Sequence, residues 1–111
     1  MTSEIYPVLQ MPVELPMREL CALKITRPEL RAVLGMPHFV ETDSYRTFGG
    51  EEDWWAFRLP SDQRVVIVLH VPYHLAVFSA DPPHLEPMLQ AFQIASDDSR
   101  LVLNSRPTII K

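Results

Sequence analysis

The stretch Arg64 to Val71, with the sequence RVVIVLHV, constrains the fold more than any other part of the chain. Its β-branched residues favour a strand, and apolar side chains occupy both sets of alternating positions. Both faces of such a strand are apolar, so each of them needs cover. Arg64 to Val71 is therefore predicted to be a central strand of a sheet.

Turn-forming residues on both sides predict the neighbours of this strand. Gly49-Gly50, Pro60 to Gln63 and Pro72-Tyr73 are typical of tight turns between antiparallel strands. We expect an α+β fold in which a three- to four-stranded antiparallel meander packs against two or three short helices. The predicted strands are Phe39 to Phe48, Trp54 to Leu59, Arg64 to Val71 and His74 to Ser79.

A capping box predicts where the first helix begins. Thr26 and Glu29 stand at the positions where each side chain can bond the backbone of the other, and Pro28 falls within the first turn. Gly35 supplies a left-handed C-terminal position before Pro37. The residues expected on the buried face are Leu30, Val33 and Leu34.

A second helix is predicted after Asp81-Pro-Pro83, and Pro87 implies that it begins near His84. Its buried stripe has the spacing i, i+3, i+4 and i+7. Arg100 to Leu103 can add a short strand, whereas Arg18 to Ile25 fits a helix or a strand equally well. The residues of the stripe are Leu85, Met88, Leu89 and Phe92.

The 111 residues are predicted to form a single domain, since a chain of this length is too short for two independent cores. Residues 1–17 contain three prolines and are expected to be an extended arm. The core is assigned to residues 26–95, and residues 104–111 are predicted to be a tail.

Charge and cysteine content restrict the partners and the compartment. The formal charge of −4, with scattered Lys and Arg, argues against nucleic acid. Cys21 is the single cysteine, so no intramolecular disulfide can form, and a cytoplasmic location is expected. The N-terminus has no signal-peptide pattern, and the longest apolar stretch, Val65 to Val77, is too short and too interrupted to cross a membrane.

His70 and His74 are the candidate metal ligands, because a tight turn between two strands can bring both imidazoles to one edge. No further His or Cys pair stands at metal-ligand spacing. The alternative is that both histidines make local hydrogen bonds at a hairpin end. No bound metal or cofactor is therefore predicted.

An acidic group surrounds the Gly49-Gly50 turn. It can form a negative patch for a basic protein partner, supply paired carboxylates for acid–base chemistry, or be a solvated loop. Catalysis needs a carboxyl group in a cleft, and a hairpin tip desolvates such groups poorly. The group comprises Glu41, Asp43, Glu51, Glu52 and Asp53.

Trp54 and Trp55 are adjacent, so on a strand they point to opposite faces, and at most one is expected in the core. The other is expected to face outward and, with Tyr45, Phe48 and Tyr73, to anchor a protein interface. Packing beneath a flanking helix is the alternative for these rings. The predicted partner-binding residues are Tyr45, Phe48, Glu51, Glu52, Asp53, Trp54 and Tyr73.

No catalytic motif is present. The chain has three glycines, no Gly-x-Ser-x-Gly elbow and no glycine-rich phosphate loop. Cys21 lies in an apolar segment and is interpreted as a small buried side chain rather than an activated thiolate. The sequence therefore favours a protein that is not an enzyme.

A predicted helix is followed by Leu34-Gly35-x-Pro37, an acidic linker, Trp55-x-Phe57 and a β-branched strand. In this order of features the chain resembles, from Thr26 to Ala80, small lipoproteins of the SmpA/OmlA type and the related β-lactamase-inhibitor-protein-like folds. The resemblance implies a helical pair packed on a short antiparallel sheet and a function in binding other proteins.

These observations favour a small non-catalytic protein-binding domain, of a bacterial inhibitor or immunity type. The alternative is a ligand- or metal-binding domain, or a small enzyme, that uses the His70/His74 end of the sheet. Self-association into a homodimer through an exposed strand edge is a third hypothesis.

Overall fold

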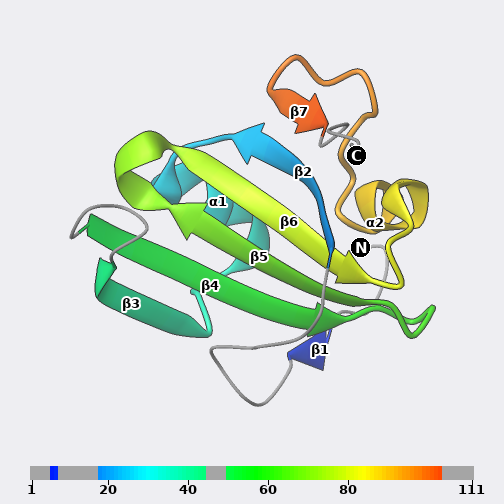
Figure 1. Ribbon diagram of the computed structural model, residues 1–111, viewed down its shortest axis with the longest axis horizontal. Helices are drawn as coiled ribbons and strands as arrows, with labels where there is room; N and C mark the ends of the chain where they lie inside the picture. The colour runs from blue at the N-terminus through cyan, green and yellow to red at the C-terminus, as the bar shows by residue number, and fades with distance from the viewer. Residues whose placement is uncertain (1–5, 8–17, 45–49, 104–111) are drawn as a thin grey trace, which may run out of the picture.

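The computed structural model describes residues 6–7, 18–44 and 50–103, which form one antiparallel sheet with two α-helices (Figure 1). The order along the sheet is β1-β4-β5-β6-β2-β7, and β3 also pairs with β4. The strands are β1 (Tyr6–Pro7), β2 (Arg18–Lys24), β3 (Phe39–Ser44), β4 (Gly50–Arg58), β5 (Arg64–His70), β6 (Leu75–Asp81) and β7 (Leu101–Leu103). The helices are α1 (Arg27–Leu34), the 3-10 helix η2 (Val71–Tyr73) and α2 (Leu85–Ala91).

The α+β prediction is confirmed, but the sheet is wider than the three or four strands expected. Strands β3 to β6 follow one another as antiparallel neighbours, as the turn residues indicated. Strand β2 then pairs with β6, β7 with β2, and β1 with β4. These added pairings join segments distant in sequence, so no local turn signals them. They also identify Arg18–Lys24 as a strand. Its residues Leu20, Cys21 and Leu23 belong to the hydrophobic core, which therefore extends beyond the predicted residues 26–95.

Parts of the predicted arm, hairpin and tail lie outside the described residues. Of residues 1–17 the structure describes Tyr6–Pro7, which pairs with Phe57 and Arg58 at the end of β4. The positions 45–48, predicted as part of a strand, and the predicted tail 104–111 are not described.

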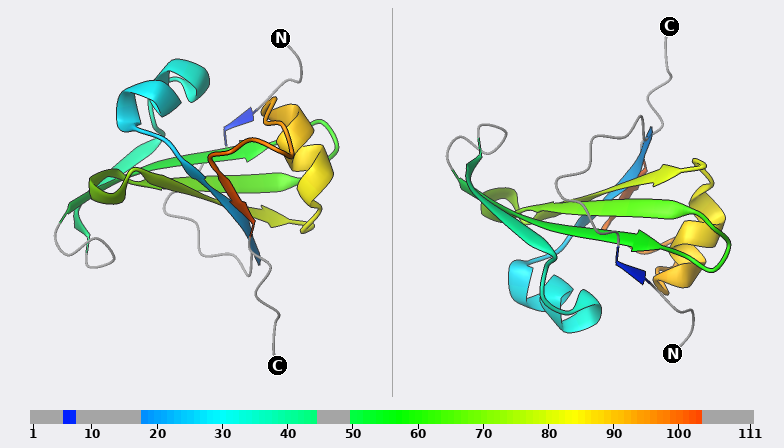
Figure 2. Two further views of the ribbon diagram at one scale, coloured as in Figure 1. Left: turned by 90° about the horizontal axis from the view of Figure 1, so that it is seen from above. Right: turned by 90° about the horizontal axis from the view of Figure 1, so that it is seen from below.

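The larger core lies between the sheet and the two helices, which cover the same face of the sheet (Figure 2). Trp55 of β4, Ile67 of β5 and Phe78 of β6 are lateral neighbours in this face and are 0%, 0% and 1% exposed. The prediction of a central strand is confirmed, because β5 has a neighbour on each side and buries Val65, Ile67 and Leu69 on the helical face. Hydrophobic burial of this row anchors the sheet to the helices.

The first helix begins as predicted. The Glu29 carboxylate accepts the backbone N–H of Thr26 at 3.1 Å and its hydroxyl at 3.0 Å, and this capping box defines the start of α1. Gly35 ends the helix with φ +85°, a value that glycine adopts without steric cost. Leu30 is buried as predicted, but Val33 is 66% exposed. The prediction for Val33 was wrong because α1 lies at one end of the sheet and turns that side chain toward solvent.

The second helix buries Met88 and Leu89, in agreement with the predicted stripe. It ends in a Schellman motif, in which the Gln93 N–H donates to the Gln90 carbonyl at 3.1 Å and the Ile94 N–H to the Leu89 carbonyl at 2.9 Å. Gln93 therefore has a left-handed φ of +59°, at a position where glycine is the usual residue.

The opposite face of the sheet carries a smaller buried cluster of Trp54, Ala56 and Val66, with Phe39 and Val68 packed against it. The Phe39 and Trp54 rings meet edge to face, with centroids 6.3 Å apart. Near this cluster, between the parts of β4 that pair with β3 and β1, the Ala56 N–H donates to His38 Nδ1 at 3.0 Å. This contact satisfies the backbone donor of Ala56.

In the ranges that the structure describes, neither α-helix has the length and apolar character needed to cross a bilayer.

Candidate functional site

Asp53 of β4 is the centre of a charged cluster beneath α1. Its side chain is 0% exposed and accepts four hydrogen bonds, two from each of two guanidinium groups. Arg27 donates at 2.9 and 2.7 Å, and Arg31 at 2.9 and 3.1 Å. The two arginines stand four residues apart, so they share one face of α1. Arg27 also pairs with Glu51 at 2.7 Å, so α1 is tied to two residues of β4.

The cluster keeps Asp53 ionised. Burial by itself favours the neutral acid and is the largest single influence, but the hydrogen bonds and charges of Arg27 and Arg31 together outweigh it. They hold the pKa of Asp53 below its usual value. The carboxylate is thus a structural anion that fixes α1 to the sheet, since a catalytic base at neutral pH needs a raised pKa and access to substrate.

Glu52 points to the other face of β4 and is also 0% exposed. The Trp54 indole N–H donates to Glu52 Oε1 at 3.2 Å. His70 Nδ1 on β5 lies 2.9 Å from Glu52 Oε2, within ion-pair distance but without hydrogen-bond alignment. This pair places an imidazole, whose side chain is 17% exposed, against a buried carboxylate.

The acidic residues that the structure describes do not form one solvated patch. Glu52 and Asp53 are buried on opposite faces of β4, each against a basic or aromatic partner, while Glu51 has a side chain that is 45% exposed. The expectation of a surface group was wrong for Glu52 and Asp53 because partners from α1 and β5, distant in sequence, cover them. Glu41 is partly buried on β3, and the side chain of Asp43 is not described.

Both tryptophans are buried, so the expectation that one of them faces outward was wrong. Trp55 belongs to the larger core, and Trp54, 6% exposed, to the smaller cluster of the other face. Tyr73 is the aromatic candidate that stays accessible, at 49% exposed on η2, which contacts β4. Tyr45 and Phe48 lie outside the described residues.

The two candidate metal ligands have different surroundings. His70 contacts Glu52, whereas His74 is exposed and adopts a left-handed conformation at the end of η2. Over residues 6–7, 18–44 and 50–103, no three His, Cys, Asp or Glu side chains gather in a geometry that can hold a metal ion.

Cys21 is 2% exposed within the larger core. Burial raises its pKa to about 11. The interpretation as a small buried side chain is confirmed, since a nucleophilic cysteine needs a lowered pKa and access.

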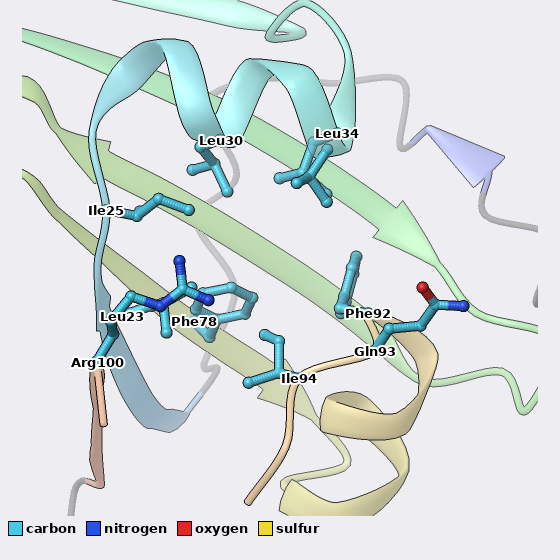
Figure 3. A pocket seen from close by; sticks show the side chains of 10 residues that line it. Leu23, Ile25, Leu30, Leu34, Phe78, Phe92, Gln93, Ile94 and Arg100 are labelled. Carbon is cyan, nitrogen blue, oxygen red and sulfur yellow. The ribbon is translucent and has the colours of Figure 1, made fainter. Parts of the chain in front are cut away.

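A pocket of about 190 Å³ opens on the helical face, between α1 and the segment after α2 (Figure 3). Its floor is formed by residues that are each less than 9% exposed, and its rim includes the exposed Val33, Gln93 and Arg100. Leu30 and Leu34 reach the pocket from α1, and Ile94 lies across from them. The floor residues are Leu23, Ile25, Leu30, Phe78 and Phe92.

Sequence reasoning missed the arginines of the Asp53 cluster and the whole pocket. A weak signal existed for the first, because Arg27 and Arg31 repeat at helical spacing on a short helix. No sequence signal existed for the pocket, because apolar lining residues from β2, α1, β6 and the segment after α2 follow the same periodicity as ordinary core residues.

No family model matches this chain, and searches of curated proteins and of solved structures find no match either.

Proposed function

We propose that this protein is a small non-catalytic protein-binding domain of the inhibitor or immunity type, acting in the cytoplasm. The observation that carries the proposal is Tyr73, a large aromatic side chain left 49% exposed at the turn between two central strands. Tyrosine is enriched among the residues that dominate binding energy at protein interfaces, and its side chain loses little conformational entropy on binding.

The net charge of the chain, −4, favours a basic partner. η2 contacts β4, the strand on which the half-exposed Glu51 pairs with Arg27. Charges of this sign accelerate association with a positive surface and reject negative ones. The resemblance of residues 26–80 to families that act by binding other proteins also supports this function.

The buried members of the predicted interface support the surface rather than contact a partner. Asp53, held by Arg27 and Arg31, fixes the first part of β4 beneath α1, and Glu51 shares Arg27 with it. The part of the surface that β4 contributes, Glu51, is therefore already ordered before binding, which reduces the entropic cost of association.

The test is affinity capture from the source cells with the wild-type chain and a Tyr73→Ala/Glu51→Gln variant. We expect a protein enriched by the wild type and lost with the variant. Val102→Ala is the matched control, because Val102 is 47% exposed on β7, at the edge of the sheet away from η2. Retention of every enriched protein by the double variant, with folding confirmed by circular dichroism, would exclude this surface.

A homodimer is distinguished in the same experiment. If the captured protein is a second copy of this chain, light scattering will report twice the monomer mass. The edge strand β3 or β7, rather than Tyr73, is then the contact to examine.

A further inference from the structure

We propose that the pocket between α1 and the segment after α2 binds a compact apolar molecule that carries a carboxylate group. This inference is independent of the protein-binding function, because the pocket lies on the helical face and Tyr73 does not line it.

The volume of the pocket determines the size of the ligand. An apolar cavity of about 150 Å³ accepts benzene, and this pocket measures about 190 Å³. At the packing density of protein interiors it holds roughly eight to ten non-hydrogen atoms. A short acyl chain or a single aromatic ring has this size.

The lining determines the character of the part that enters. Leu23, Ile25 and Leu30 present aliphatic groups, and Phe78 and Phe92 present rings, with no charged side chain in the floor. A polar group placed there would lose its hydrogen bonds to water without replacement. The ligand must therefore insert an apolar part and keep its polar group at the rim.

Arg100 supplies a cation at the rim. Two of its donors reach the Asp98 carboxylate, from Nε to Oδ1 at 3.1 Å and from Nη2 to Oδ2 at 2.9 Å. A guanidinium group has five N–H donors, so further donors stay available for an acceptor on the ligand. Glu29 and Asp98 are the acidic groups whose charges act on Arg100, and a carboxylate ligand must compete with them.

Gln93 is the second polar residue at the rim. It occupies the left-handed Schellman position, where glycine fits at lower steric cost. Its side-chain amide can donate to a ligand carboxylate, which a glycine cannot do.

Octanoate, with ten non-hydrogen atoms, is the probe, and 1-octanol is the neutral comparison. We expect octanoate to shift the methyl resonances of Leu23, Ile25 and Leu30 in an NMR titration, with a Kd of about 1 mM or below. Val33→Trp, which places a ring at the rim, should weaken octanoate at least about tenfold by filling the pocket. Met36→Trp is the matched control, because Met36 is also exposed beside α1 but does not line the pocket.

The carboxylate is tested by two exposed charge changes. Arg100→Gln should weaken octanoate about two- to fivefold and leave 1-octanol unchanged, as expected for one exposed charge contact. Asp98→Asn removes the competing anion and should strengthen octanoate by a similar factor.

Three results would overturn the proposal. The first is that octanoate at about 10 mM, a concentration well above the expected Kd, shifts no resonance of the lining residues. The second is Val33→Trp binding octanoate as the wild type does. The third is an octanoate Kd that does not respond to Arg100→Gln, which removes the assignment of a carboxylate ligand.

Discussion

Replacement of Asp53 by asparagine tests whether the buried charge cluster fixes α1 to the sheet. Asparagine keeps the size of the side chain but removes the charge that both guanidinium groups share. Removing one partner of a fully buried ion pair costs about 3–5 kcal/mol. Here the cost should be lower, because Arg27 and Arg31 side chains are 27% and 26% exposed and Arg27 keeps Glu51.

We therefore expect Asp53→Asn to lower the free energy of unfolding by about 2–3 kcal/mol. For a chain of 111 residues this corresponds to a fall in Tm of about 10 °C. Urea unfolding followed by tryptophan fluorescence is the assay, because Trp54 and Trp55 adjoin Asp53 on β4 and are 6% and 0% exposed. Asp62→Asn is the control, since Asp62 pairs with Arg58 at 3.6 Å where both side chains are exposed, and should change stability by less than about 0.5 kcal/mol.

The pH dependence of the free energy of unfolding is a second test of the same prediction. The pKa of Asp53 is lower in the folded than in the unfolded chain, so the unfolded chain binds the proton more readily. The stabilisation that ionised Asp53 provides is present above the pKa of the unfolded chain, about 3.9, and is lost as pH falls through the lower pKa of the folded chain. The difference between wild type and Asp53→Asn should be constant from about pH 5 to 7 and shrink below about pH 4. A loss under about 1 kcal/mol, or one that persists unchanged at about pH 2.5, would refute the reasoning.

Two further predictions concern single residues. Gln93→Gly should raise the free energy of unfolding by about 0.5–1 kcal/mol, because glycine relieves the left-handed strain at the end of α2. A lower free energy of unfolding in urea would contradict the assignment of strain to Gln93. Cys21 should resist iodoacetamide at pH 8 in the folded protein and react on unfolding, because burial raises its pKa to about 11 and leaves it 2% exposed. Labelling is followed by mass spectrometry. Rapid labelling of the native chain would show that β2 is not held in the core.

Local patterns predicted those elements whose signals lie within a few residues. The capping box at Thr26 and Glu29 placed the start of α1, and the spacing of Met88 and Leu89 placed α2. The β-branched run predicted β5 as a central strand. In each case the hydrogen bonds or the buried face depend on neighbours at i+2, i+3 or i+4, and these are visible in the sequence.

Burial of the charged and aromatic candidates was not predictable in this way. Glu52 and Asp53 are consecutive acids beside a glycine turn, a pattern typical of solvent-exposed loops. They became buried because Arg27 and Arg31 approach one face of β4 and His70 and Trp54 cover the other. The partners of Asp53 stand 26 and 22 residues away, and no local rule connects them.

The sequence by itself determined the α+β class, where each α-helix begins and the antiparallel course from β3 to β6, because these depend on short-range hydrogen bonding and periodicity. Only the tertiary structure decided the joining of β1, β2 and β7 to the sheet, the charge cluster under α1 and the pocket beside Arg100. Those features arise where segments distant in the chain meet. Their energies depend on the three-dimensional arrangement of side chains, which local sequence patterns do not specify.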